Sequence, residues 1–153
     1  MPDPKENISV IDRRLITWFR KVAGPAARLA LFVIFFWFGF LKLVGVSPAE
    51  SLVESLFNRT ISFIPFNTFY VGFSLLECLI GVLFLFPKTT RLVIPLLVLH
   101  MVTTFLPLIF LPQITWQLPF VPTLEGQYII KNLAIIALAI GIAANIAPFD
   151  QKA

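Results

Sequence analysis

The sequence has very few residues that could bind a metal or form a covalent cross-link. Of its 153 residues, only Cys78 is a cysteine and only His100 is a histidine. A single cysteine can form neither an intrachain disulfide nor a thiolate metal site. Together the two residues cannot hold an iron–sulfur cluster or supply both axial ligands of a haem. We therefore expect no built-in cofactor, so any electrons would travel on a bound organic carrier or on a partner's cofactor.

The motifs of several common enzyme classes are missing as well. We find no phosphate-binding glycine loop, no catalytic cysteine pair and no serine triad. A zinc site with three ligands would need carboxylates that the apolar segments do not provide. No nucleic-acid signature accompanies the net charge of +4. We expect neither a metal nor a nucleic acid as partner, and the sequence leaves open whether the protein is an enzyme.

Charged residues are also scarce. They make up 13% of the chain and hydrophobic residues 58%, whereas a soluble domain has about 25% charged residues. The apolar residues fall into four blocks, and about 20 apolar residues cross a bilayer core of ~30 Å. The sequence thus predicts an all-α, integral membrane four-helix bundle in the lipid bilayer. Its spans are 28–46, 66–86, 91–111 and 127–147, with tails at 1–27, partly amphipathic, and 148–153.

The basic residues predict the orientation of the spans. Four spans place both tails on one side, and short segments rich in Lys and Arg stay in the cytoplasm. The basic residues on that side are Lys5, Arg13, Arg14, Arg20, Lys21, Lys88, Arg91 and Lys152, with Arg28 at the membrane edge; the opposite loops contain only Arg59. Both termini are therefore predicted to be cytoplasmic. The first block is expected to be retained, because no small-residue cleavage site follows it.

Both outer loops have distinct patterns. In "VSPAESLVESLF" (46–57), Ser47 precedes Pro48 and stands three residues before Glu50, which is typical of a helix capping box. This predicts a short amphipathic helix on the outer surface, or else an ordinary loop helix. The second outer loop contains three prolines, which argue against a regular helix. In the third span, Pro95 and Pro107 each remove a backbone hydrogen bond and can kink the helix.

Four ionisable residues lie inside the predicted spans: Lys42, Glu77, His100 and Lys131. At ~1.5 Å per residue, Glu77 lies ~16 Å from the outer side and His100 ~14 Å from the inner side, so the two share one level. The two lysines both lie ~6 Å below the outer boundary. A direct contact between Lys42 and Glu77 would then need extended side chains or a bridging water.

These depths allow a functional and a structural interpretation. Each lysine alone could snorkel to the interface, but two at one depth favour a shared polar chamber that opens outward. Glu77 cannot snorkel from the midplane and is expected to face the interior. A buried Glu–His pair below two lysines would suit an anionic or quinone-like head group. Equally, the same residues could form a structural network that fixes the register of the helices.

Three segments carry a resemblance to a known family. "RLALFVIFFWFGFLKLVG" (28–45), "LLECLIGVLFLFPKTTRL" (75–92) and "EGQYIIKNLAIIALA" (125–139) occur in order and cover roughly a third of the chain. They resemble the first, second and fourth helices of the DoxX-like family, most closely its bacterial inner-membrane branch linked to reactive chlorine stress. The resemblance implies a four-helix membrane bundle and matches Lys42, Glu77, Glu125 and Lys131 to the recurrent polar positions of the family. His100 belongs to no family motif.

The resemblance also implies partners, because some members of the family are associated with quinol oxidase or thiosulfate:quinone oxidoreductase complexes. We therefore expect a small inner-membrane subunit of a redox or oxidative-stress system. It would bind a quinone or a small anion through Lys42, Glu77, His100, Glu125 and Lys131, and it could form a homo-oligomer. The alternative is a non-catalytic assembly or interaction subunit whose buried charges are structural. A transporter is less favoured, because the four spans contain no detectable repeat.

Overall fold

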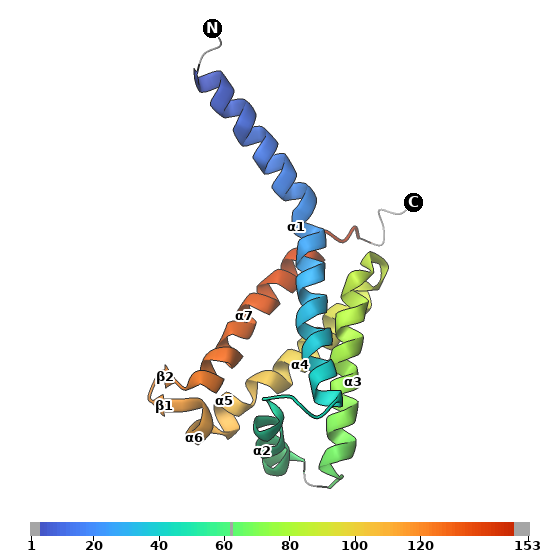
Figure 1. Ribbon diagram of the computed structural model, residues 1–153, viewed down its shortest axis with the longest axis vertical. Helices are drawn as coiled ribbons and strands as arrows, with labels where there is room; N and C mark the ends of the chain where they lie inside the picture. Colours follow the sequence, from blue (N-terminus) through green and yellow to red (C-terminus); the bar gives the residue numbers. More distant parts are fainter. Residues whose placement is uncertain (1–3, 62, 149–153) are drawn as a thin grey trace.

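The computed structural model of the chain describes residues 4–61 and 63–148, with side chains described from residue 11 onward (Figure 1). The long helices are α1 (Pro4–Leu43), α2 (Glu50–Thr60), α3 (Phe66–Leu85), α4 (Thr90–Phe105) and α7 (Leu124–Ala143). The short elements are a 3-10 turn (Pro87–Thr89), α5 (Pro107–Phe110), α6 (Pro112–Thr115), β1 (Trp116–Leu118) and β2 (Val121–Pro122). The Lys5 and Lys152 side chains, used in the orientation argument, lie outside the described part.

Within the described residues, four helical segments are long and apolar enough to cross a membrane. They are Ile11–Leu43, Phe66–Leu85, Pro87–Phe110 and Leu124–Ala143. This confirms the prediction of a mostly helical protein with four candidate spans, because each predicted block overlaps one of these segments. Most of the outward side chains in these segments are apolar, as expected where lipid replaces water as the solvent.

The first helix is longer than its predicted span. It begins at Pro4 rather than near residue 28 and ends at Leu43, and it continues through Pro25. A proline inside a helix removes one hydrogen bond and bends the helix rather than always ending it. Figure 1 shows the N-terminal part of α1 inclined to the rest and extending beyond the ends of the other helices. The predicted N-terminal tail is therefore largely part of one continuous helix.

The two prolines of the third span have different effects. Pro95 stays inside α4, whereas α4 ends at Phe105 and Pro107 begins the separate helix α5. Proline suits the first position of a helix, where its missing N–H would have no partner. The predicted third span over 91–111 overlaps the candidate span Pro87–Phe110, and the interruption expected at Pro107 is the break between α4 and α5.

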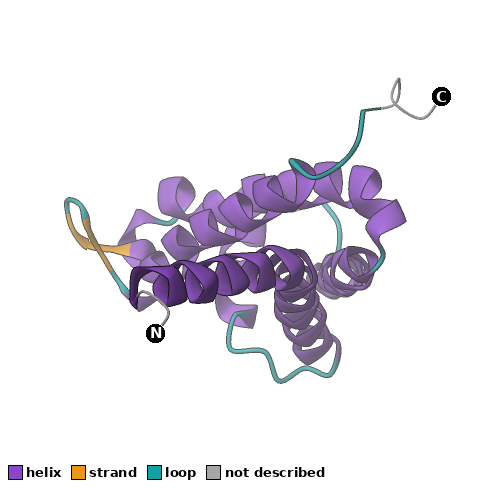
Figure 2. Ribbon diagram, turned by 90° about the horizontal axis from the view of Figure 1, so that it is seen from above, coloured by secondary structure: helices purple, strands orange, loops and turns teal. Residues whose placement is uncertain are grey.

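The connections differ from the predicted details. Helix α2 begins at Glu50, with Ala49 at the cap and no side-chain cap bond. The Ser47 hydroxyl instead accepts a hydrogen bond from the Ala49 N–H at 3.3 Å, so the predicted capping box does not form. The second connection contains the one-turn helix α6, which begins at Pro112, and then a β1–β2 hairpin. This hairpin lies to one side of the helices (Figure 2).

Helix α1 packs along α3, and two glycines allow the close approach. A Cβ at Gly39 would lie 2.9 Å from the Cys78 backbone nitrogen, and one at Gly81 would lie 2.7 Å from that of Phe36. Real Cβ atoms do not come so close to a backbone atom. The buried apolar core extends from this interface to α4 and α7, and it includes Leu31, Phe35, Ile80, Phe84, Val93, Leu97, Met101, Ala139 and Ile142.

Arg28 joins three helical elements at the turn between α3 and α4. Its guanidinium donates to the carbonyl oxygen of Phe84 at 3.2 Å and to the hydroxyl of Thr90 at 2.8 Å. Phe84 lies in the last turn of α3 and Thr90 begins α4. Arg28 of α1 therefore holds the α3–α4 turn at a fixed position along α1.

Replacing Gly81 with Ala should destabilise the protein, because the new methyl group would overlap the α1 backbone. We expect the free energy of unfolding in detergent to fall by ~1–3 kcal/mol. Gly141 is the matched control, since a Cβ there meets nothing within 4 Å, and Gly141→Ala should be neutral or stabilise by up to ~1 kcal/mol. Equal stability of the two variants would contradict the close packing of α1 on α3.

Candidate functional site

Three of the five predicted site residues meet inside the bundle. Lys42 is the penultimate residue of α1, Glu77 lies in the middle of α3 and His100 lies in α4. The Lys42 ammonium donates to Oε2 of Glu77 at 2.5 Å. Only 6% of the lysine side chain and 8% of the glutamate side chain are exposed. The two opposite charges are thus buried as a pair, which avoids the cost of a lone charge inside a membrane.

His100 completes the cluster on the other side of the carboxylate. Its Nε2 lies 3.4 Å from Oε1 of Glu77, and only 4% of the imidazole side chain is exposed. This is the pairing that the equal depths of the two residues predict. The carboxylate therefore contacts the lysine with one oxygen and the histidine with the other, and we name these three residues the Lys–Glu–His cluster.

Two phenylalanines enclose the imidazole. Phe35 of α1 meets the His100 ring edge to face at 5.4 Å between centroids, and Phe73 of α3 stacks on it at 5.0 Å. The Phe73 ring also lies 5.8 Å from the Lys42 ammonium, within the range of a cation–π contact. The buried Nδ1 of His100 has no hydrogen-bond partner among the residues that the structure describes. A buried nitrogen without a partner is uncommon and marks a position where a ligand could bind.

Gly39 explains why Lys42 reaches Glu77 directly. It stands one helical turn before Lys42, and a Cβ there would also lie 2.9 Å from the Cβ of Glu77. From helical rise alone, the backbones of Lys42 and Glu77 were expected to lie ~10 Å apart in height. Gly39 lies level with Glu77 in the structure, so Lys42 stands only about one turn above the carboxylate.

The structure does not bring Glu125 or Lys131 into the cluster. Both side chains are exposed on α7, and neither has an ion pair with the described cluster residues. The Lys131 ammonium instead lies 5.0 Å from the ring centre of Tyr128, one turn earlier. Glu125 lies in the first turn of α7, where a negative charge is favourable to the helix dipole. The expected chamber with two lysines is therefore wrong in its α7 members.

A groove lies beside the cluster, between α3 and α4. Its volume is about 410 Å³, within the range of small-molecule sites. The lining residues are Thr68, Phe69, Gly72, Phe73, Leu76, Leu99, His100 and Thr103. Thr68, Gly72 and Leu99 are exposed, so the groove opens sideways from the bundle. Where these helices span the membrane, this opening faces lipid.

Sequence reasoning missed most of this groove. The α3 residues recur at helical spacing, from Thr68 and Phe69 to Gly72 and Phe73, but so do many apolar residues of a spanning helix. Both Thr103 and Thr104 donate to the His100 carbonyl, at 2.7 and 2.9 Å, and Thr103 is the one that lines the groove. Gly72 was a usable signal, because a glycine on a lipid-facing stripe leaves a gap.

The arrangement offers acid–base and binding chemistry. An ammonium, a carboxylate and an imidazole are in contact, and each can gain or lose a proton. In the part of the chain that the structure describes, no three His, Cys, Asp or Glu side chains gather as a metal site. The residues that line the groove are mostly apolar, with the imidazole of His100 and the threonines Thr68 and Thr103 as the polar members.

The fold and this site define a multi-pass membrane protein with an interior Lys–Glu–His cluster beside a groove that opens between two of its spans. Comparison of the chain with family models, with curated proteins and with solved structures finds no match.

Breaking the buried pair from one side should destabilise the protein more than removing both charges. Lys42→Met or Glu77→Gln alone leaves an uncompensated buried charge, which costs ~3–5 kcal/mol. The double variant carries neither charge, so its loss of stability should be smaller than the sum of the two single losses. Unfolding in detergent measures all three variants. The exposed Lys131→Met is the control and should stay within ~0.5 kcal/mol of the parent; additive losses would show that the two charges act independently.

Proposed function

We propose that the chain is a DoxX-like protein of a bacterial inner membrane that binds a quinone-type head group in the groove between α3 and α4. Its place would be as a small subunit of a redox or oxidative-stress system. The observation that carries the proposal is His100, which lines the groove and contacts the buried Glu77. Its Nδ1 has no hydrogen-bond partner in the described part of the chain.

The position of the groove favours a lipid-soluble ligand over a soluble anion. Its opening lies among exposed residues of two spans, so a molecule dissolved in the bilayer reaches it by lateral diffusion. Phe69 and Phe73 supply aromatic walls, and flat rings pack well on such side chains. Pockets of this kind are mostly apolar, with a few polar groups that orient the ligand. A quinone has this combination of a flat ring, polar oxygens and an apolar tail.

The tautomer of His100 favours the reduced form of the ligand. The carboxylate of Glu77 faces Nε2, so Nε2 is the nitrogen that carries the proton in a neutral imidazole. Nδ1 is then a hydrogen-bond acceptor, and a quinol hydroxyl group is a donor. Because Nδ1 is covered, binding requires a neighbouring side chain to move, and Phe73, stacked on the imidazole, is the candidate. Electrons would leave the quinol on a cofactor of a partner protein.

A second candidate function is an assembly subunit without a ligand. The specific observation in its favour is the mutual satisfaction of Lys42 and Glu77, which are almost fully buried. A buried polar network of this kind can fix the register of packed helices. Under this alternative the charges hold three spans in place, and the partner binds elsewhere on the surface.

Quinol binding separates the two candidates. We expect purified protein in lipid nanodiscs to bind a short-tailed quinol, and Gly72→Leu, which fills the groove, to weaken binding at least tenfold. His100→Gln should also weaken it, by roughly tenfold for one lost hydrogen bond. Gly141→Leu on α7 is the control and should bind like the parent.

The assembly alternative predicts a different pattern. It expects no quinol binding by the parent and a stable partner complex in pull-down, which is lost in variants of the cluster. Unchanged quinol affinity in a correctly folded Gly72→Leu protein would exclude the groove as the site.

We also propose the orientation with both termini cytoplasmic and with α2 lying amphipathically on the outer membrane surface. In support, Phe57 of α2 packs on Phe66 and Phe69 at the start of α3, while Glu54 and Arg59 are exposed. Phe57 thus packs on the protein while Glu54 and Arg59 are left open, which suits a helix that lies at the membrane interface.

Single cysteines test this orientation. In a Cys78→Ala background, Asn58→Cys on α2 should react with a membrane-impermeant maleimide in intact spheroplasts, whereas Lys88→Cys should react only after the membrane is opened. The reason is that positive residues keep the α3–α4 turn inside. The opposite labelling pattern would reverse the proposed orientation.

A further inference from the structure

The N-terminal part of α1, residues 11–24, has an apolar face that no other part of the described protein covers. Figure 1 shows this segment extending away from the bundle. The exposed fraction of its large apolar side chains lies between 43% and 58%, for Ile11, Leu15, Ile16, Trp18 and Phe19. A group of exposed large apolar side chains on one helix indicates a contact surface.

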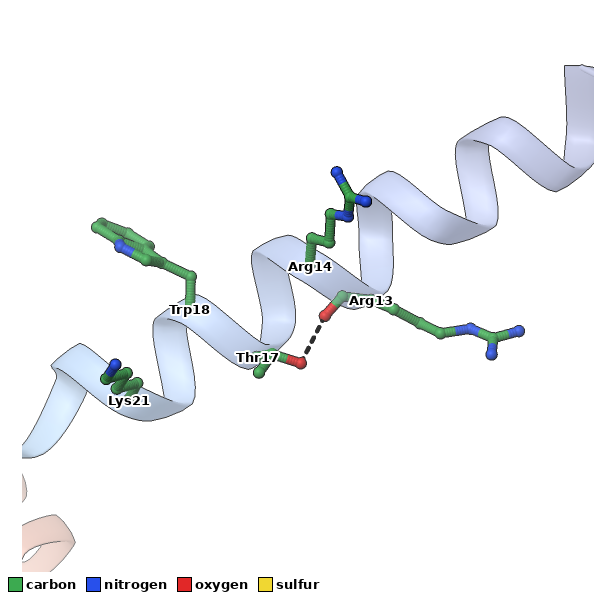
Figure 3. A pocket seen from close by; sticks show the side chains of 5 residues that line it. All are labelled: Arg13, Arg14, Thr17, Trp18 and Lys21. Carbon is green, nitrogen blue, oxygen red and sulfur yellow. Dashed lines mark hydrogen bonds between the residues drawn. The ribbon is translucent and has the colours of Figure 1, made fainter.

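The basic residues of this segment lie on the other face. At 100° per residue, Ile11, Leu15 and Phe19 fall on one side of the helix and Arg13, Thr17 and Arg20 on the opposite side. Trp18 lies at the edge of the apolar side, next to Arg14 and Lys21. Asp12 is the single acidic residue of segment 11–24. Figure 3 shows Arg13, Arg14, Thr17, Trp18 and Lys21 around a shallow pocket on this helix. The Thr17 hydroxyl turns back to the Arg13 carbonyl at 2.7 Å, so the outward polar groups are almost all cations.

Residues 11–24 lie outside the bilayer core. Helix residues Ile11–Leu43 number 33, or ~50 Å at ~1.5 Å per residue, and a bilayer core is only ~30 Å thick. Arg28 binds the turn between α3 and α4, which places the end of the bundle at its level. Residues before Arg28 therefore lie at or beyond the headgroup region on this side.

We propose that residues 11–24 form a docking arm that lies on the membrane surface and binds the phosphate groups of anionic phospholipids. One lipid surface offers both things that the arm lacks: acyl chains for its apolar face and negative charges for its basic face. A second copy of the arm would cover the apolar face alone and would add four more cations nearby. Pro25 has no N–H to bond the Lys21 carbonyl, and a helix bends easily at such a position.

Tryptophan fluorescence of the full chain tests the arm. Trp37→Phe with Trp116→Phe leaves Trp18 as the single tryptophan. In vesicles that contain phosphatidylglycerol, shallow bromines on the acyl chains should quench Trp18, and they should quench it much less in phosphatidylcholine alone. Arg14→Gln with Lys21→Gln should lower the ratio of docked to free arm about fivefold for each charge removed.

The control removes two charges elsewhere, with Arg59→Gln and Lys88→Gln, and should leave the quenching of Trp18 unchanged. Equal quenching in both kinds of vesicle would overturn the proposal, and so would a Trp18 that stays accessible to aqueous iodide in both. Disulfide formation between copies carrying Trp18→Cys in the Cys78→Ala background would assign the apolar face to a second copy and would also overturn it.

Discussion

The ion pair between Lys42 and Glu77 is the interaction on which the interior of this protein depends. It lies near Gly39, where α1 and α3 pack closely, and neither charge would be stable there without the other. The carboxylate then holds His100 of α4 in contact. Three spans are thereby linked through two oxygen atoms, and the imidazole is presented to the groove by this arrangement. Gly39 and Gly81 are part of the same constraint, because the pair forms only if the helix backbones come close.

The number and approximate limits of the spans could be predicted, since the hydropathy of a chain records how many times it crosses lipid. The height of Glu77 relative to His100 could be predicted too, because each residue adds a fixed rise along a helix. The rotation of the helices could not. Lys131 was expected at the height of Lys42, but its side chain is exposed on α7, and the helical rise alone does not say which side of a helix faces the bundle. Counting residues therefore predicted the depth of Glu77 and His100. It did not predict that Lys42, and not Lys131, joins them.

The ends of helices were harder to predict for a related reason. The N-terminal tail joins α1 because the arginines and apolar residues of 11–24 are compatible with a helix whether or not it is in lipid. Pro25 and Pro95 stay inside helices, while Pro107 starts a new one. These outcomes depend on whether neighbouring groups satisfy the freed carbonyls, and that information is tertiary. The groove between α3 and α4 is likewise a result of packing. Only Gly72, which leaves a gap on the surface of α3, indicates it in the sequence.

The place of Lys42 at the end of its helix has a consequence for how the chain enters the bilayer. Helix α1 leaves the ribosome before α3 exists, so for that interval the lysine has no carboxylate to contact. Because only Leu43 follows it in the helix, its long side chain can keep the ammonium among the lipid headgroups. The buried position of the ammonium therefore requires the carboxylate of α3, whereas α1 without α3 can keep its charge at the interface.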